Sequence, residues 1–368
     1  MKLLIAIIML AALVYFGRAF FTPAEYALND ADIAHADRVV SQFMSRYDVP
    51  GLSLAWAKDG RIILTRAYGV VNKGSNIPVN VNHQFRIASV SKPITSTMIM
   101  RLVEEGRISL DDTVFGTDGI LADSYVASDP NVRAITVRHL LEHTAGEEWS
   151  NERDDPMFAN PLMTHHELIQ WVLDNRRLVL PPGSTYHYSN FGYSVLGRVI
   201  ERVTGEAYAD YFRTMTAPLG LSDFAIASDF EAGGILEVQY YAQKNTSPYA
   251  FPIARMDSYG GWKTTPEDMV KFLLVVDGFS EPADILQPQT IIEMTTPGLQ
   301  NGNYAKGWAV NSSNNWWHLG SLPGTASVAV RTSSNMAWAV FVNTRSPDSG
   351  FDGALDNLMW QVVQGVHQ

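Results

Sequence analysis

Ser89 and Lys92, three residues apart, are a pair of residues that could do chemistry together, and Pro93 follows them directly. Three residues are nearly one helical turn, so both side chains would lie on one face of a helix. Proline is tolerated in a first helical turn, where the backbone dipole favours negative charge on an attacking oxygen. A lysine with a lowered pKa can serve as the base. The spacing predicts a serine nucleophile, although the same spacing also occurs at ordinary helix starts with a solvated lysine.

Tyr188 and Asn190 could complete such a site from the segment 188–190. A tyrosine in a loop beside a nucleophile can pass a proton to a leaving group. An asparagine amide can hold both Lys92 and a substrate carbonyl. Taken alone, a tyrosine is more often packed in the core or at its rim.

His318, Gly320 and Ser321 lie on a predicted strand. Glycine at this position would let a substrate backbone lie against the strand edge, with the following amide free to point into a cleft. The simpler interpretation of His318 is a partly buried histidine packed between Trp317 and Leu319.

The elements that must position these residues follow from hydrophobic periodicity. Helical spacing over 30–47 predicts one amphipathic helix, and alternation on both sides of the turn 58–60 predicts a hairpin. Further helices are expected near 90–105, 136–143, 165–175, 192–203 and 351–366. The strands are expected at 52–57, 61–68, 308–311, 315–319, 326–331 and 336–343.

Strands at both ends of the chain and helices between them predict an α+β fold. One antiparallel sheet would be built from both chain ends, flanked by N- and C-terminal helices, with a mostly helical region inserted. We expect a catalytic domain over 30–368, with its sheet part at about 30–84 and 256–368 and its helical part at about 85–255. A cleft should lie at the junction of the two parts.

The composition excludes several classes of function. The chain has 368 residues, of which 46% are hydrophobic and 18% charged, enough for a sizeable core. A net charge of −11 would repel nucleic acid. Cysteine is absent, which removes disulfides, thiolate metal sites and cysteine nucleophiles. We expect an oxygen or amine nucleophile, no cofactor, and a small-molecule or peptide substrate.

The first residues have the composition of a targeting segment. Lys2 precedes an unbroken apolar run over 3–16, and the small residues Gly17 and Ala19 follow. We expect residues 1–21 to be a signal peptide or a membrane anchor, with a buried N-terminal helix as the alternative. The protein would then be periplasmic or extracellular, and membrane-attached if the segment is retained.

Together, the three motifs resemble those of the β-lactamase-related serine hydrolases: class C β-lactamases, D-alanyl-D-alanine carboxypeptidases, D-aminopeptidases and certain esterases. The resemblance extends from about Ala36 to the C-terminus. It rests on the segments 49–51, 85–92, 135–146, 182–197 and 260–268.

The resemblance implies that Ser89 is the nucleophile that accepts the acyl group, and that Lys92 and Tyr188 share proton transfer. Asn190 would orient these groups, and the amides of Ser89 and Ser321 would form the oxyanion hole. The implied activity is that of an exported serine hydrolase cleaving a peptide, a β-lactam or a small ester. A penicillin-binding or sensing protein that does not turn over is the alternative.

The sequence departs from class C β-lactamases at His318, where their third motif begins with lysine. Histidine is mostly neutral near pH 7, so it attracts an anionic substrate less. This favours a peptidase or an esterase over a lactamase. Arg345 could supply a replacement cation for a substrate carboxylate, or it could be an ordinary exposed arginine after a strand.

Residues 139–143 also fit the His-x-x-Glu-His pattern of inverted zinc peptidases. Two histidines four residues apart on a helix can bind one zinc ion. No third carboxylate is recognisable on a second helix, and the family resemblance implies no metal here. We therefore predict no metal site, and we interpret His165 and His166 as a solvated helix start.

Overall fold

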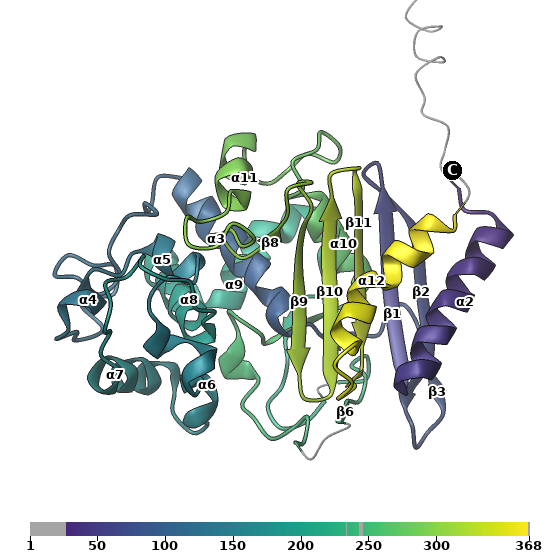
Figure 1. Ribbon diagram of the computed structural model, residues 1–368, viewed down its shortest axis with the longest axis horizontal. Coiled ribbons are helices and arrows are strands. Elements are labelled where there is room, and N and C mark those ends of the chain that lie inside the picture. The colour runs from purple at the N-terminus through teal and green to yellow at the C-terminus, as the bar shows by residue number, and fades with distance from the viewer. Residues whose placement is uncertain (1–26, 233, 243–245, 367–368) are drawn as a thin grey trace, which may run out of the picture.

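The computed structural model describes residues 27–232, 234–242 and 246–366. Its centre is a seven-stranded antiparallel sheet in the order β3-β2-β1-β11-β10-β9-β8 (Figure 1). The strands are β1 (Gly51–Lys58), β2 (Arg61–Asn72), β3 (Ile77–Pro78), β8 (Ala309–Val310), β9 (Trp316–Leu322), β10 (Thr325–Thr332) and β11 (Met336–Val342).

The two ends of the chain meet in the middle of this sheet, where β1 pairs with β11. Leu54 lies opposite Val340, and Trp56 lies opposite Trp338. Both strands are buried along most of their length, because helices cover both faces of the sheet. The α+β fold predicted from the sequence, with one sheet built from both chain ends, is confirmed.

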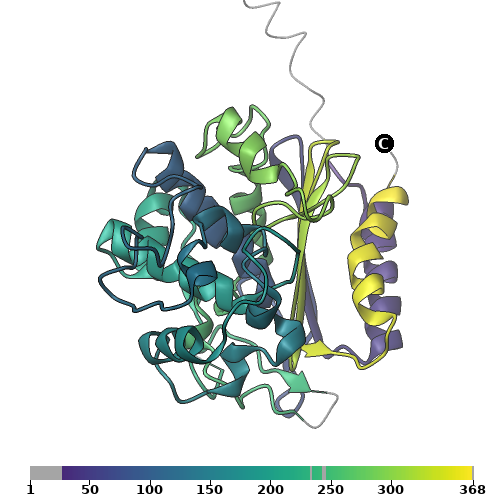
Figure 2. The same cartoon turned by 60° about the vertical axis from the view of Figure 1, so that its left-hand side comes forward.

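One face of the sheet is covered by α2 (Asp30–Tyr47) and α12 (Phe351–Gln364), which lie side by side (Figure 2). Asn29 and Asp32 form a capping box that starts α2. Phe351 packs against the rings of Phe43 and Tyr47, with ring centroids 5.7 and 5.3 Å apart. This aromatic contact joins the first helix of the described chain to the last.

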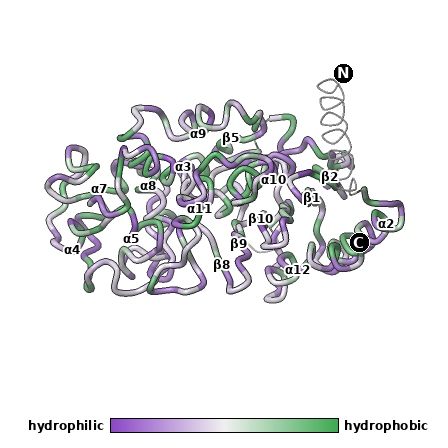
Figure 3. Tube along the Cα trace, turned by 90° about the horizontal axis from the view of Figure 1, so that it is seen from above, coloured by the Kyte–Doolittle hydropathy of each residue, from purple (hydrophilic) through white to green (hydrophobic). Residues whose placement is uncertain are grey.

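The opposite face is covered by the inserted helical region, and Figure 3 shows the layers from above. The helix α10 packs on the sheet, and α3 packs against α8 and α11. The helices here are α3 (Ser91–Glu104), α4 (Pro130–Arg133), α5 (Val137–Leu141), α6 (Pro156–Ala159), α7 (His165–Asn175), α8 (Asn190–Thr204), α9 (Tyr208–Thr216), α10 (Pro266–Leu274) and α11 (Pro288–Thr295).

Two small sheets complete the fold. The first has the order β4-β7-β5 and the second pairs β12 with β6. Their strands are β4 (Phe85–Arg86), β5 (Ala225–Ile226), β6 (Tyr241–Ala242), β7 (Trp262–Thr264) and β12 (Thr344–Arg345). The short β4 leads directly into η1 (Ala88–Val90), a 3-10 turn that carries Ser89.

Several expected boundaries differ from the structure. The helix expected over 136–143 ends at Leu141, whereas the strand expected over 315–319 continues to Leu322 and so includes Gly320 and Ser321. The predicted signal or anchor at 1–21 lies outside the described residues. Within the described ranges, none of the helices is both long and apolar enough to cross a bilayer.

Candidate active site

Ser89 lies in η1, between β4 and α3, and is partly exposed between buried neighbours. Ala88 adopts a left-handed backbone conformation with φ of 47°, which is uncommon for a residue with a side chain. The turn is anchored on both sides of Ser89. Ile87 donates its N–H to the Trp262 carbonyl at 2.9 Å, and Ser91 Oγ donates to the Ala88 carbonyl at 2.7 Å. These contacts hold the Ser89 hydroxyl in a constrained turn at the start of α3.

Lys92 has no exposed surface, and its side-chain nitrogen contacts three oxygens. Nζ lies 3.3 Å from Ser89 Oγ, 2.8 Å from Asn190 Oδ1 and 3.1 Å from the Tyr259 carbonyl. Burial lowers the pKa of Lys92 well below its usual value, and the Asp155 carboxylate opposes this shift. The buried environment therefore favours the neutral amine.

The three contacts suit a neutral amine as a base. The Asn190 and Tyr259 oxygens can only accept hydrogen bonds, so they take the two N–H groups of the amine. The remaining contact, Ser89 Oγ, belongs to a hydroxyl that can donate. The lone pair of a neutral Lys92 would then face the serine proton.

Tyr188 lies in the loop before α8, with its hydroxyl beside Ser89. Burial raises the pKa of Tyr188, and the interaction with the Ser89 side chain opposes that shift. Lys92 Nζ lies 4.7 Å from the centre of the tyrosine ring. The phenol therefore keeps its proton near neutral pH, beside both Ser89 and Lys92.

Asn190 is the first residue of α8 and is held by two further contacts. Its Nδ2 donates to Asp155 Oδ2 at 2.8 Å, and its backbone N–H donates to Asn151 Oδ1 at 2.9 Å. Asp155 Oδ1 also accepts the N–H of Met157 at 3.0 Å, as the N-cap of α6. Asp155 thus fixes the orientation of the Asn190 amide, with its oxygen towards Lys92.

The edge of β9 forms another wall of the site. The two-residue strand β8 pairs only with Trp316 and Trp317, so the rest of β9 has β10 as its only sheet neighbour among the described strands. A Cβ atom on Gly320 would overlap the Ile87 carbonyl and the Ser327 hydroxyl. Ser327 Oγ itself donates to the Ile87 carbonyl at 2.6 Å. Only glycine at 320 allows β9 to approach η1 this closely.

His318 lies on β9 and is buried. Its Nε2 lies 3.2 Å from the Tyr304 hydroxyl, and its Nδ1 lies 2.7 Å from the Leu319 carbonyl. The Tyr304 hydroxyl also lies 3.1 Å from Nε2 of His143. Burial is the main cause that lowers the pKa of His318 to about 3, and Lys92 acts in the same direction when its amine is protonated. Both ring nitrogens therefore contact the protein, and the ring is neutral.

Arg345 lies on β12 rather than beside Ser89. It is exposed, and Nη2 donates to Asp352 Oδ2 at 2.6 Å. It lines a cavity of about 340 Å³ that Ser321 also lines, at the end of β9. Arg345 and Ser321 therefore line one cavity, and the Arg345 guanidinium forms an ion pair with Asp352.

The geometry required by the zinc alternative is absent. Because α5 ends at Leu141 and His143 has φ of 58°, His139 and His143 do not lie on one helix face. The Nδ1 of His139 accepts the N–H of Thr136 at 3.1 Å, and the Nδ1 of His143 accepts the N–H of Ser189 at 3.1 Å. Across the described ranges, no cluster of three histidine or acidic side chains could hold a metal ion.

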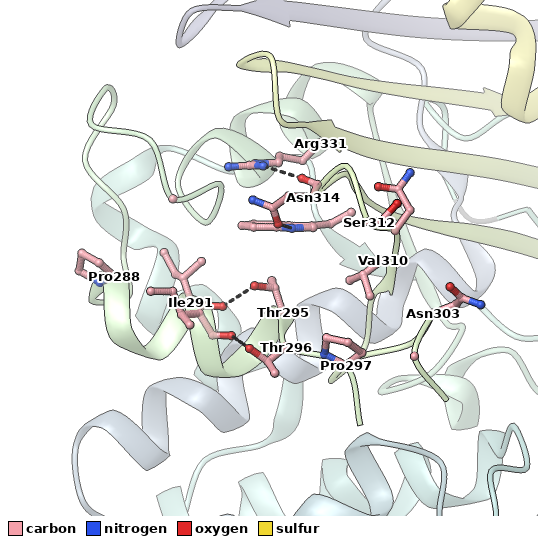
Figure 4. Close-up of a pocket in the computed structure, with 15 residues that line it drawn as sticks. Pro288, Ile291, Thr295, Thr296, Pro297, Asn303, Val310, Ser312, Asn314 and Arg331 are labelled. Carbon is pink, nitrogen blue, oxygen red and sulfur yellow. Dashed lines mark hydrogen bonds between the residues drawn. The ribbon is translucent and has the colours of Figure 1, made fainter. Parts of the chain in front are cut away.

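A cavity of about 710 Å³ lies between α11 and the strands β8 to β10, apart from Ser89 (Figure 4). Its charged lining residue, Arg331, packs over the rings of Trp316 and Phe279. Nε donates to the Asp277 carbonyl at 2.8 Å, and Nη1 donates to the Asn314 carbonyl at 3.0 Å. This arginine joins two loops to the sheet, and none of the predicted site residues lines the cavity.

Three residues of the site were missed by the sequence analysis: Asp155, Tyr304 and Tyr259. Asp155 had a local signal, because an aspartate directly before Pro156 is a typical helix start. Tyr304 and the carbonyl of Tyr259 reach the site only through tertiary packing. The sequence pattern indicates His143 only as a possible zinc ligand.

A family model described as Beta-lactamase matches residues 36–358. The chain belongs to this family. Among curated relatives, Protein flp of Staphylococcus aureus (strain N315) is 24% identical over 328 residues, which is 84% of this chain. Penicillin-binding protein 4 of Amycolatopsis lactamdurans is 28% identical over 247 residues, which is 66% of this chain. The matches span 63% of the length of each relative.

Solved structures share the fold of this Beta-lactamase family chain. The D-amino acid amidase of Ochrobactrum anthropi SV3 is 25% identical, with a TM-score of 0.73 over 90% of this chain and 100% of the amidase. The octameric penicillin-binding protein homologue of Pyrococcus abyssi is 23% identical, with a TM-score of 0.71 over 89% of this chain and 77% of the homologue.

Proposed function

We propose that this protein is a serine hydrolase that cleaves an amide or an ester through a covalent acyl-enzyme on Ser89. The observation that carries the proposal is the contact set of Lys92. A fully buried amine with two obligate acceptors and one hydroxyl neighbour can remove a proton from that hydroxyl. The relatives support the same reaction class, because they include a penicillin-binding protein and, among solved structures, a D-amino acid amidase.

In the first half of the proposed reaction, Ser89 Oγ bonds to the substrate carbonyl carbon as its proton passes to Lys92. The carbonyl π electrons move to oxygen, where the amides of Ser89 and Ser321 would stabilise the charge. When the oxyanion collapses, the bond to the leaving nitrogen or oxygen breaks. The leaving group takes a proton from the Lys92 and Tyr188 pair, which leaves an ester on Ser89.

The second half uses the same groups in reverse. Water adds to the ester carbonyl as its proton passes to Lys92 and Tyr188. The bond from carbon to Ser89 Oγ then breaks, and the serine oxygen regains a proton. The products are the free acid and the starting enzyme, so the proton balance closes without a cofactor.

We propose that residues 1–21 direct export to the periplasm or the cell exterior, or hold the catalytic domain at a membrane. N-terminal sequencing of the protein recovered from a membrane and a soluble fraction would test this. A mature chain that still begins at Met1 in a cytosolic fraction would contradict export.

A small substrate panel with a label chase would test the activity. The panel comprises nitrocefin, a D-alanyl-D-alanine peptide, a D-amino-acid anilide and a short-chain nitrophenyl ester. We expect turnover of at least one of these, and rapid loss of a fluorescent penicillin or an acyl label after the chase. A label that forms but persists, with no turnover of any panel member, would contradict a hydrolase and favour a sensing protein.

A further inference from the structure

Three buried side chains form a hydrogen-bonded chain that ends at the third motif. His143 follows α5, Tyr304 lies before β8, and His318 lies on β9. The Tyr304 hydroxyl lies 3.1 Å from His143 Nε2 and 3.2 Å from His318 Nε2. The outer ends of the chain are both backbone groups: the Ser189 N–H at His143 and the Leu319 carbonyl at His318.

The backbone group at the first end determines where the proton of His143 lies. A backbone N–H can only donate, so Nδ1 of His143 must carry the lone pair that accepts from Ser189. The neutral ring then has its proton on Nε2 and donates to the Tyr304 oxygen. The Tyr304 hydroxyl can then donate its own proton to His318 Nε2.

The backbone group at the other end independently fixes the position of the His318 proton, and it requires the same direction for the hydrogen bond with Tyr304. A carbonyl oxygen can only accept, and the Leu319 oxygen lies 2.7 Å from Nδ1 of His318. The proton of a neutral His318 is therefore on Nδ1, and its Nε2 carries the lone pair that faces Tyr304. One of these backbone groups can only donate and the other can only accept. Together they fix which atom donates and which accepts in every hydrogen bond from His143 to His318.

The surroundings oppose protonation of His318. The groups that face this chain are the Lys92 amine and the phenols of Tyr186, Tyr188 and Tyr193. Among the described residues, no carboxylate forms an ion pair with either ring. Protonation would also set the Nε2–H of His318 against the Tyr304 hydroxyl, which already accepts from His143 Nε2, so the phenol would lose its donor contact to His318.

We propose that Tyr304, anchored by His143, is a positioning residue that keeps His318 in the neutral Nδ1–H form and so directs the site to substrates without a carboxylate beside the scissile bond. The proposal rests on the proposed hydrolase function for its substrate class, but not for the hydrogen-bond chain. A lysine at position 318 would offer a cation, whereas this histidine has both nitrogens occupied by the protein.

Other basic side chains do not supply that charge. The three contacts of Lys92 are all to the protein, and Arg345 is paired with Asp352. Arg255 donates to the carbonyls of Asn160, Met163 and Met157. A substrate carboxylate at His318 would therefore lose its hydration without gaining a partner.

The first test is nitrogen NMR of protein labelled with ¹⁵N at histidine, which needs no turnover. We expect the His318 ring, assigned with His318→Asn, to show the neutral Nδ1–H pattern from pH 8 down to pH 5. An Nε2–H pattern, or an imidazolium at pH 6, would overturn the proposal whether or not the protein is a hydrolase. Absence of turnover with an intact Nδ1–H pattern would contradict only the hydrolase function and the substrate preference that depends on it.

The second test compares nitrophenyl butyrate with mono-nitrophenyl succinate, two esters of similar size of which only the second carries a carboxylate. We expect the wild type to prefer the butyrate. Tyr304→Phe removes the donor to His318 Nε2, so the pKa of the buried ring should rise from about 3, and the ratio of kcat/KM should move about 3- to 10-fold towards the succinate at pH 4.5, but little at pH 8.

Tyr186→Phe is the matched control, because Tyr186 packs on His143 but its hydroxyl hydrogen-bonds with Asn301 instead. This control should keep the wild-type ratio at both pH values. An unchanged ratio in a folded Tyr304→Phe variant, or an equal change in both variants, would overturn the proposal. If Tyr304→Phe does not fold, the NMR result on the wild type decides.

Discussion

The Ser89 hydroxyl lies between two groups that can move its proton, the Lys92 amine and the Tyr188 phenol. If the two act as one unit, Lys92→Met or Tyr188→Phe alone should lower kcat by roughly 10²- to 10⁴-fold. The double variant should lose much less than the product of the two losses. Single-turnover kinetics with the best panel substrate would measure this. Losses that multiply would point to independent roles.

Asp155 reaches the nucleophile only through Asn190, and it opposes the lowering of the pKa of Lys92. Asp155→Asn removes a negative charge, so the pKa of Lys92 should fall further. Activity that needs neutral Lys92 is lost as pH falls through that pKa, so the acid limb of the pH–rate profile should move to lower pH. The maximal rate should fall on the order of tenfold, because the Asn190 amide is held less firmly.

The control for this prediction is Asp154→Asn at the next residue. The side chain of Asp154 is 83% exposed and pairs with Arg176 at 3.6 Å, away from Lys92. Asp154→Asn should leave the acid limb of the pH–rate profile at the wild-type pH. A limb that moves to higher pH in Asp155→Asn would show that the sign assigned to Asp155 is wrong.

At the scale of elements, the contact between β9 and η1 sets the width of the site. Gly320→Ala would place a methyl group against the Ile87 carbonyl and the Ser327 hydroxyl, so β9 would have to move away from η1. We expect acylation to slow by roughly 10²-fold and the melting temperature to fall. Stopped-flow labelling and thermal unfolding would measure the two effects.

Gly353→Ala in α12 is the matched control, because a Cβ atom there meets nothing within 4 Å. Alanine is the better helix former, so this variant should be as stable as the wild type or slightly more so. Wild-type acylation in Gly320→Ala would show that the close approach of β9 does not matter for the site.

Elements with a regular pattern could be predicted from the sequence, and those set by long-range contacts could not. The helices over 30–47 and 165–175 have the predicted bounds, because capping residues and periodicity agree there. The helix α5 stops early, at Leu141, and the histidine that follows it turns to accept the Ser189 N–H. Tyr304 contacts His318 from a loop without periodicity. Such contacts depend on where two separate segments meet, which no local pattern records.

At the scale of the molecule, the site depends on a sheet whose strands come from both ends of the chain. Phe351 begins α12 and packs on Phe43 and Tyr47 of α2. Phe351→Ala should lower the free energy of unfolding by about 3–5 kcal/mol. Urea denaturation would measure this, with Gln361→Ala on the exposed side of α12 as the control.

The helices α2 and α12 cover one face of the sheet (Figure 2), whereas Ala88 and Val90, which flank Ser89, pack in the core on the other face. Phe351→Ala should therefore keep the acylation rate per folded molecule. A loss of stability under 1 kcal/mol would contradict the role of this helix pair in holding the sheet together. The order of the three motifs along the chain pointed to the fold and the family. It did not reveal which groups face His318.

In the proposed reaction, Ser89 carries the acyl group. The most direct measurement of this is peptide mapping by mass spectrometry after labelling with a fluorophosphonate and with a panel substrate quenched in acid. We predict that the added mass lies on Ser89 in the wild type and is absent from Ser89→Ala, which should melt at nearly the same temperature. A mass increase on another residue, or turnover by a folded Ser89→Ala variant, would contradict the account.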